Sequence, residues 1–453
     1  MGWFSGTPGP TGRPAVTAIV LGDRVRVGLS SVLTAPWSHT GAEADTGLSA
    51  LLFDQYPDRP AQAVVQLRGE SVKRYDVLVI GGGIAGVSIG YELAADRTVG
   101  LVEMESSLAF HTTGRSAATF LESYGGRVIR LLTTASRAFM EDPPVEFTPP
   151  LLSPMPLLWI GAHGAAADVR ELHAEVVEFV PDVRLLSPAD AAAMSPLVRE
   201  DWTELAMLEP GASEIDVAAV HAGFTAGLRA RGGEIHTSSG VAQLQRTEGG
   251  WRAITATGEA FEAPIVINAA GAWCDDVALL AGVEPVGIHP LRRTVFMVSA
   301  PDNTDASGLP LVADVRGTFY VKPEGRQYLC SPADETPSLP CDARPEEIDI
   351  ARAIEHINDA TRLDVRHVRS SWAGLRNFVA DRTPVVGFDD EAEGFFWFIG
   401  QGGYGIQISP ALARVGAGLV RDGEIPTDLR ARGLRSKHLG RARLAGLTGL
   451  QGH

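Results

Sequence analysis

Cysteine is scarce in this sequence: Cys274, Cys330 and Cys341 are the only three among 453 residues. Such an odd and sparse set is typical of a protein from a reducing compartment and argues against a disulfide framework. No CxxC pair and no cluster of cysteine and histidine has the spacing of metal ligands, so we expect no bound metal. The cysteine content therefore favours a cytoplasmic location.

Long apolar runs and excess positive charge are also missing. No uninterrupted apolar stretch approaches the roughly 20 residues of a membrane-spanning helix, which predicts no transmembrane segment. The N-terminal residues do not combine a basic stretch with a following apolar stretch, so we expect no secretory signal. The formal net charge of −16 disfavours binding to nucleic acid and to anionic membrane surfaces.

Length and local composition predict several separate parts. A chain of 453 residues is too long for one compact core and fits two or three domains. Proline, glycine, serine and threonine are scattered through residues 1–72, which predicts a poorly ordered extension or, alternatively, a small appended element. A further alternative is a natural start near Val72. Residues 429–453 are rich in arginine and are expected to form a solvated, disordered basic tail.

A strand–turn–helix–strand pattern is the clearest local signal. A β-branched strand at residues 76–80 precedes a helix at 84–95 and a second strand at 98–102. The turn has the spacing Gly81-x-Gly83-x-x-Gly86, where glycine permits a tight turn, close approach to a pyrophosphate and close helix packing. The helix start favours phosphate, and Glu103, after the second strand, can accept ribose hydroxyls. The pattern predicts a dinucleotide site and leaves FAD and NAD open.

Three further motifs decide between these cofactors by resemblance. Residues 111–118 and 266–273 resemble the second and third FAD signatures of the D-amino-acid oxidase superfamily, and residues 401–407 resemble its loop beside the flavin ring. The resemblance implies FAD, held non-covalently because no cysteine signature for covalent flavin is present. It assigns the following residues to the cofactor: Gly81, Gly83, Ile84, Ala85, Gly86, Glu103, Gly114, Arg115, Ser116, Ala117, Val241, Ala270, Gly271, Trp273, Gly374, Gly402, Gly403, Tyr404, Gly405 and Ile406.

A longer resemblance covers residues 75–428, which are similar nearly end to end to the bacterial FAD-dependent D-arginine dehydrogenases. The similar stretches include residues 111–118, 319–323 and 372–381. This implies an α/β fold, α+β overall, with a Rossmann-like FAD-binding domain and a second, largely antiparallel β substrate domain. The expected FAD-binding domain comprises residues 73–150, 208–290 and 371–428, and the expected substrate domain comprises residues 151–207 and 291–370.

The resemblance also implies a substrate site. Arg293 and Arg376 correspond to carboxylate-binding arginines, whose planar guanidinium groups suit a carboxylate. Strand alternation separates Arg293 from Arg292 without saying which of the two faces inward. The hydroxyl of Tyr320 is expected at the same carboxylate. Tyr124 corresponds to a tyrosine on a mobile loop that closes over the substrate, and Gln407 to a glutamine beside the flavin.

Two positions depart from the D-arginine dehydrogenase pattern. Leu157 stands where those enzymes have a glutamate for the substrate guanidinium, and Thr119 stands where they have an active-site histidine. An apolar side chain cannot pair with a buried cation, so we expect a pocket for a neutral side chain. Glu122 is an alternative partner for a cationic substrate.

Three functions fit these observations. The first is a D-amino-acid dehydrogenase that transfers hydride from Cα to flavin N5, giving an imino acid that water converts to a 2-oxo acid and ammonia. The second is an oxidase or dehydrogenase of secondary or cyclic amines of the sarcosine, proline or opine type. The third is a non-catalytic flavin-binding protein, against which the arginine pair and Tyr320 argue. The electron acceptor, whether quinone, carrier or oxygen, stays open.

Overall fold

A computed structural model describes residues 17–21, 24–28, 72–301, 306, 308–447 and 449–450. The chain divides into two compact units, residues 1–59 and 60–453. In the first unit, β1 (Thr17–Leu21) and β2 (Arg24–Gly28) pair antiparallel as a short hairpin. The prediction of a poorly ordered extension otherwise falls outside the described residues. No described helix is both long enough and apolar enough to cross a membrane.

The centre of the second unit is a six-stranded sheet in the order β12-β5-β4-β16-β24-β23. All its neighbours pair parallel except β23 with β24. The four inner strands β5, β4, β16 and β24 are short and almost wholly buried, which explains their mostly apolar sequences, whereas the edge strands β12 and β23 are partly exposed. The strands are β4 (Val77–Ile80), β5 (Val99–Val102), β12 (Glu234–His236), β16 (Ile265–Asn268), β23 (Val385–Phe388) and β24 (Phe395–Ile399).

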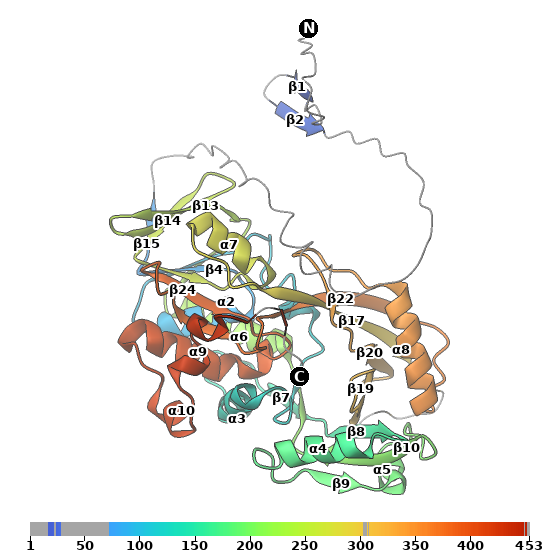
Figure 1. Cartoon of the computed structure of the whole chain (residues 1–453). Helices are drawn as coiled ribbons and strands as arrows, with labels where there is room; N and C mark the ends of the chain where they lie inside the picture. The colour runs from blue at the N-terminus through green and yellow to red at the C-terminus, as the bar shows by residue number, and fades with distance from the viewer. Residues whose placement is uncertain are drawn as a thin grey trace. The chain divides into compact units, whose positions relative to one another are not determined.

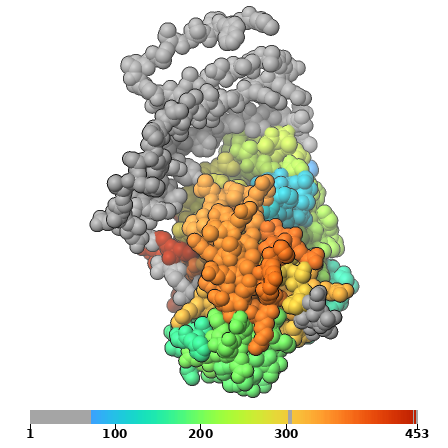
Figure 2. Space-filling model, turned by 90° about the vertical axis from the view of Figure 1, so that its right-hand side faces the viewer, coloured from blue at the N-terminus to red at the C-terminus, as the bar shows by residue number. Residues whose placement is uncertain are grey.

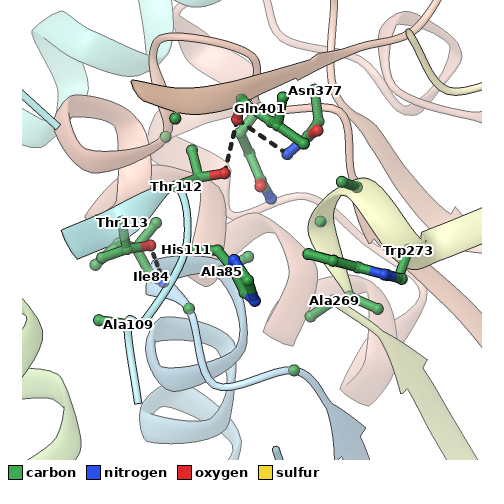
Figure 3. Close-up of a pocket in the computed structure, with 18 of the residues that line it drawn as sticks. Ile84, Ala85, Ala109, His111, Thr112, Thr113, Ala269, Trp273, Asn377 and Gln401 are labelled. Carbon is green, nitrogen blue, oxygen red and sulfur yellow. Dashed lines mark hydrogen bonds between the residues drawn. The ribbon is translucent and has the colours of Figure 1, made fainter. Parts of the chain in front are cut away.

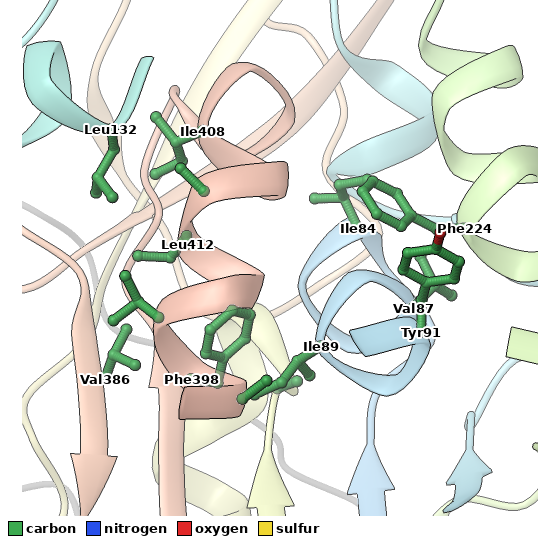
Figure 4. Packing of buried hydrophobic residues seen from close by; sticks show 14 of the residues in the cluster. Ile84, Val87, Ile89, Tyr91, Leu132, Phe224, Val386, Phe398, Ile408 and Leu412 are labelled. Atoms are coloured by element: carbon green, nitrogen blue, oxygen red, sulfur yellow. The ribbon is translucent and has the colours of Figure 1, made fainter. Parts of the chain in front are cut away.

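Helices bury the apolar side chains of this sheet. These helices are α2 (Ile84–Leu93), α3 (Arg127–Glu141), α6 (Val217–Ala230) and α9 (Gly405–Asp422). In Figure 4, Ile408 and Leu412 of α9 lie near Leu132 of α3, while Tyr91 of α2 lies against Phe224 of α6. Sheet and helices form the α/β unit that the sequence pattern predicts, and helix α2 begins at the glycine turn.

A smaller antiparallel meander precedes strand β16 of the central sheet in the chain. It comprises β13 (Val241–Thr247), β14 (Gly250–Thr255) and β15 (Ala260–Ala263), with β3 (Lys73–Arg74) parallel to β15. The chain then enters β16, the 3₁₀ turn η2 (Gly271–Trp273) and helix α7 (Cys274–Ala281). This connection brings the 266–273 motif to the carboxyl edge of the central sheet, next to β4.

A second, nine-stranded sheet holds most of the remaining strands, in the order β21-β17-β20-β19-β18-β8-β10-β9, with β22 also paired to β17. Its pairings are antiparallel except that of β18 with β8. The strands are β8 (Leu157–Ala162), β9 (Arg184–Leu186), β10 (Thr203–Glu209), β17 (His289–Ser299), β18 (Leu311–Asp314), β19 (Tyr320–Glu324), β20 (Gln327–Ser331), β21 (Thr336–Pro337) and β22 (Ser370–Phe378).

Three helices accompany this second sheet: α4 (Ala166–Val176), α5 (Pro188–Met194) and α8 (Glu347–Ala360). Figure 1 shows α8 beside β17 and β20, and α4 beside β8 and β10. In Figure 2 the green surface of the residues near position 200 borders the orange surface of the residues that follow position 308. The α/β fold with a second, largely antiparallel sheet is therefore confirmed.

A three-stranded sheet lies in the order β6-β11-β7 and contains Thr119. It consists of β6 (Thr119–Phe120), β11 (Ser213–Ile215) and β7 (Leu152–Pro154). Glu214 of β11 pairs with the buried Lys322 of β19. This ion pair joins the three-stranded sheet to the second large sheet, close to the end of β19 that carries Tyr320.

The expectation of a solvated C-terminal tail is wrong for the described residues beyond Asp428. They form α10 (Thr427–Ala431) and the 3₁₀ turns η3 (Ser436–His438) and η4 (Arg441–Leu444). Arg441 pairs with the buried Asp389 at 2.7 Å, and Arg443 pairs with Asp381 at 2.7 Å. Leu434 and Leu439 are buried as well. Local composition could not predict these ion pairs, because the acidic partners of the basic residues come from distant parts of the sequence.

Candidate active site

The glycine turn between β4 and α2 forms one end of a cavity of about 280 Å³. A Cβ added at Gly86 would lie 1.9 Å from the carbonyl oxygen of Gly81, and one added at Gly81 would lie 2.5 Å from that of Ala269. Gly83 caps α2 without any side-chain hydrogen bond. Gly83, Ile84 and Ala85 all line the cavity, so the helix start presents backbone N–H groups and positive potential to it.

Glu103 follows β5 and faces the same end of the cavity. Its Oε2 accepts a hydrogen bond from the Gly82 N–H at 2.6 Å, and its Oε1 accepts one from the Glu105 N–H at 2.9 Å. These bonds fix the carboxylate while each oxygen keeps further acceptor capacity. The group is therefore oriented to accept hydrogen bonds from sugar hydroxyls.

The 3₁₀ turn η1 (Thr113–Arg115) forms the adjoining wall. Thr113 Oγ1 accepts a hydrogen bond from the Ile84 N–H at 3.0 Å, as Figure 3 shows, and so joins this wall to α2. The guanidinium of Arg115 donates to the carbonyls of Ala343 and Ala373 at 3.0 and 3.2 Å, and it pairs with Asp342. Arg115 lines the cavity, but its charge is engaged with the loop before α8 and with β22.

Residues from three separate motifs complete the middle of the cavity. The rings of His111 and Trp273 lie 4.6 Å apart between centroids, and both residues line it (Figure 3). His111 Nδ1 and Asn377 Oδ1 are buried and have no hydrogen-bond partner among the described residues. Because buried polar atoms are normally paired, two such atoms in one cavity wall fit a polar ligand.

The far end of the cavity is built from side chains of the second sheet. Arg293 of β17, Tyr320 of β19 and Arg376 of β22 all line it. Arg292 instead pairs with Glu346 and with Asp349, the latter at 2.7 Å. Strand alternation therefore places Arg293, and not its neighbour, toward the cavity.

Arg376 is the cation with the fewest partners at this end. Its Nη1 donates to the Tyr124 hydroxyl at 3.0 Å, and no carboxylate pairs with it in the described part of the chain. Arg293 donates from Nε to the Asp334 carbonyl at 2.8 Å and lies 3.4 Å from Glu335. A Cβ at Gly403 would lie 2.8 Å from Arg376 Cζ, so glycine there lets the guanidinium approach the loop before α9.

The charges of these groups affect one another. Burial and the neighbouring Arg376 cation lower the pKa of Arg293. Burial alone would lower the pKa of Arg376, but the nearby phenols of Tyr124 and Tyr320 raise it. Burial alone would raise the pKa of Tyr124, but the charges of Arg376 and Arg293 outweigh that effect and lower it. Two buried cations and polarised phenol groups make this end suited to an anion.

The structure places most, but not all, of the residues expected at the site in the wall of the cavity. All of them line the cavity except Gly86, Gly114, Tyr124, Leu157, Tyr404 and Gln407. Tyr124 reaches the site through its bond to Arg376. Leu157 is 1% exposed and packs in an apolar cluster with Tyr124 and Tyr320.

Gln407 and Glu122 are engaged with the protein instead. Gln407 forms hydrogen bonds with both backbone groups of Leu121 and with Thr133. Glu122 pairs with Arg137, so the alternative partner for a cationic substrate is already neutralised.

Some residues of the site were missed. Thr112 Oγ1 donates to the Leu375 carbonyl at 2.6 Å and lines the cavity with Asn377 (Figure 3). Glu209, at the end of β10, is fully buried and contacts the segment before Tyr124. No local sequence signal identifies Glu209, because its strand, Thr203–Glu209, also carries the exposed Glu204.

Fold and cavity together define a dinucleotide-binding protein with an anion-binding cluster at one end of its cavity. The chain belongs to the family of FAD dependent oxidoreductases called DAO, which matches residues 76–419. Glycine oxidase from Geobacillus kaustophilus is 25% identical over 385 residues, covering 81% of this chain and 98% of that enzyme. Human mitochondrial dimethylglycine dehydrogenase is 24% identical over 391 residues, covering 79% of this chain and 43% of that enzyme.

A solved structure supports the same fold. The crystal structure of glycine oxidase from Geobacillus kaustophilus matches with a TM-score of 0.66 at 22% identity, covering 77% of this chain and 95% of that one. The family match over residues 76–419 identifies the chain as an FAD-dependent oxidoreductase. The glycine turn, the start of α2 with a glycine at its N-cap, and the unpaired atoms of His111 and Asn377 fit FAD as a ligand of this cavity.

Proposed function

We propose that this protein oxidises D-amino acids with neutral side chains to imino acids, which water converts to 2-oxo acids and ammonia. The observation that carries the proposal is the convergence of Arg293, Arg376 and Tyr320 on one end of the FAD cavity. A substrate carboxylate would supply the anion that this cluster is suited to bind.

The side chains have distinct tasks in this proposal. Arg376 and Arg293 bind the substrate carboxylate, and Tyr320 and Tyr124 donate hydrogen bonds to it. Holding the carboxylate fixes the position of Cα within the cavity, which lowers the entropic cost of reaction. Bound FAD supplies the two-electron acceptor for the hydride that leaves Cα. The amine must be neutral when the hydride leaves, so that its lone pair can form the C=N bond.

The preference for a neutral side chain is supported by the acidic residues of the cavity wall. Among the described residues, Glu103 and Asp276 are the acidic ones that line it. Glu103 lies at the dinucleotide turn and Asp276 lies on α7, away from the arginine pair. Leu157 belongs to an apolar cluster behind the tyrosines, and Glu122 is paired with Arg137. A substrate guanidinium would therefore lack a carboxylate partner.

A second candidate is the oxidation of a secondary, tertiary or cyclic amine that carries a carboxylate. Its support comes from a relative, since dimethylglycine dehydrogenase is named for a tertiary amine that carries a carboxylate. The arginine pair serves such substrates equally well because they carry the same carboxylate. The two candidates differ in the product: a primary amine releases ammonia, whereas a cyclic amine such as proline does not.

The test is loss of flavin absorbance under anaerobic conditions with a matched panel of substrates. We expect D-leucine to bleach the flavin, L-leucine to do so far more slowly, and the neutral D-amino acids to release ammonia. Faster bleaching by sarcosine or proline would replace the first candidate with the second. No bleaching by any member of the panel would contradict both candidates.

A further inference from the structure

The segment Leu121–Tyr124, here called the Tyr124 loop, is held by side chains from three different elements. The first is Gln407 in the first turn of α9. Its Oε1 accepts a hydrogen bond from the Leu121 N–H at 3.2 Å, and its Nε2 donates to the Leu121 carbonyl at 3.3 Å. Nε2 also donates to Thr133 Oγ1 on α3 at 2.9 Å. The amide of Gln407 therefore satisfies both backbone groups of one loop residue.

Glu209 at the end of β10 holds the next two residues. Its Oε1 accepts hydrogen bonds from the N–H groups of Glu122 and Ser123 at 3.0 and 3.3 Å, and its Oε2 accepts one from the Ser123 hydroxyl. Glu209 is 0% exposed, and no cationic side chain pairs with it among the described residues. The loop is thus the source of its hydrogen-bond donors.

Arg130 of α3 closes the third side. Its Nε donates to the Ser123 carbonyl at 3.0 Å, and its Nη2 pairs with Glu175 at 3.2 Å. The Tyr124 N–H donates back to the Leu121 carbonyl at 3.3 Å, which tightens the turn. Tyr124 itself contacts the ring of Tyr404, at 5.0 Å between centroids, and accepts the hydrogen bond from Arg376.

These contacts bear on whether the Tyr124 loop can open. Moving it away would leave the Glu209 carboxyl group buried without its donors. Burial already raises the pKa of Glu209 and the loop donors oppose that rise, so an open loop would leave a buried polar group unpaired. Moving the loop would also break both bonds between the Gln407 amide and Leu121, and only the bond to Thr133 on α3 would stay. The bonds of Glu209 and Gln407 to the loop form with the loop in the position that brings Tyr124 to Arg376.

We propose that Glu209 and Gln407 are positioning residues that keep Tyr124 fixed against Arg376, at the edge of the substrate site, throughout turnover. Tyr124 then does not move with a lid. The inference rests on the proposed function only for the identity of the ligand that Tyr124 meets. The positioning residues act through Tyr124 and do not touch the reacting atoms.

The test combines Glu209→Gln with Tyr124→Phe in a double-mutant cycle. Glu209→Gln keeps the shape of the side chain and replaces one acceptor with a donor that opposes the loop N–H groups. We expect it to raise KM for the oxidised amino acid about tenfold, with FAD content unchanged. Tyr124→Phe should then cost little more in the Glu209→Gln background than that variant alone. Equal fold losses in both backgrounds would overturn the proposal.

Strand β10 also offers a matched control for Glu209→Gln. Glu204→Gln makes the same chemical change at an exposed glutamate of β10 that accepts a hydrogen bond from Gly164. We expect it to leave KM and kcat unchanged. Gln407→Met removes the second contact independently and should reproduce the rise in KM. A rise with Glu204→Gln, or none with Gln407→Met, would contradict the assignment of these roles.

A readout that needs no substrate separates this inference from the proposed function. Hydrogen exchange of the Glu122 and Ser123 amides should be slow in the wild type and faster in Glu209→Gln. Gly126→Ala, for which the added Cβ has open space, should leave kcat unchanged because no hinge moves there. Fast exchange of both amides in the wild type would contradict the proposal that the Tyr124 loop stays in place, even if amino acids are oxidised. Slow exchange without any amino-acid oxidation would overturn the proposed function alone.

Discussion

The two ends of the cavity are built in different ways. The dinucleotide end uses backbone groups from one short continuous motif, the glycine turn that contributes Gly81, Gly82 and Gly83 to the cavity wall. The substrate end uses side chains from β17, β19, β22 and the Tyr124 loop, which are distant in sequence. Substitutions that add a side chain in the glycine turn should therefore abolish FAD binding. Substitutions that remove a charged side chain at the substrate end should change KM for the substrate and leave FAD bound.

The largest expected effect is loss of FAD in Gly86→Ala. The added Cβ would lie 1.9 Å from the Gly81 carbonyl oxygen, so the turn must open and the helix start must move. The matched control is Gly90→Ala on the same helix, where the nearest atom is the flexible Leu228 side chain at 3.3 Å. FAD released on denaturation measures the outcome. Full FAD content in Gly86→Ala would show that this close contact is not needed.

The charge of the substrate side chain should have the next largest effect. We expect kcat/KM for D-leucine to exceed that for D-arginine, since an unpaired buried guanidinium costs about 3–5 kcal/mol, on the order of several hundredfold or more. Leu157 does not line the cavity, so Leu157→Glu should bury a carboxylate in an apolar cluster and lower the melting temperature without creating a preference for D-arginine. A wild type that prefers D-arginine would mean that another carboxylate serves the substrate, and Glu335 would be the next residue to test.

Neighbouring arginines on β17 provide the third comparison. Arg293→Met should raise KM for amino acids roughly 10- to 150-fold, because charge-assisted bonds contribute about 1.5–3 kcal/mol. Arg292→Met breaks the pairs with Glu346 and Asp349 and should lower the melting temperature while KM stays near the wild-type value. Steady-state kinetics and thermal unfolding of both variants measure this split. The reverse result would assign Arg292 to the substrate.

The smallest effect concerns pH. The charges of Arg376 and Arg293 outweigh burial and lower the pKa of Tyr124, so its phenol ionises below the usual pH range of tyrosine. The phenolate repels a carboxylate, and Kd for 4-methylpentanoate should rise up to about tenfold per pH unit above that pKa. This ligand has no amine that titrates. Flavin absorbance reports binding, and Tyr124→Phe should lose the dependence; an unchanged pH profile in that variant would exclude Tyr124.

The dinucleotide end could be predicted from sequence because its determinants are local. Glycine spacing, the flanking strand and the helix all fall within residues 76–103. At Gly81 and Gly86 the structure shows why glycine is required, because a Cβ there would overlap a backbone carbonyl group. The choice of Arg293 over Arg292 depended on resemblance, because a strand's alternation gives two faces without identifying the inner one. The pairing of β17 with β22 supplies what the local sequence lacks.

Other features depend on partners far away in the sequence. Gln407 was expected beside the flavin, and its two hydrogen bonds to Leu121 reach 286 positions back in the sequence. Glu209 is an ordinary glutamate in the sequence and becomes informative only when its strand meets the Tyr124 loop. The arginines after Asp428 were expected in solvent because Asp381 and Asp389 are not identifiable as their partners from local composition.

The central claim is that Arg376 binds the substrate carboxylate. The most direct measurement is kcat/KM of the wild type and Arg376→Met for two substrates: the leucine enantiomer that the wild type oxidises, and 3-methylbutylamine, which has the same side chain without the carboxylate. We predict that the wild type strongly prefers leucine and that Arg376→Met reduces leucine oxidation at least about tenfold, with little loss for the amine. Equal losses for both substrates, with FAD still bound, would contradict the claim.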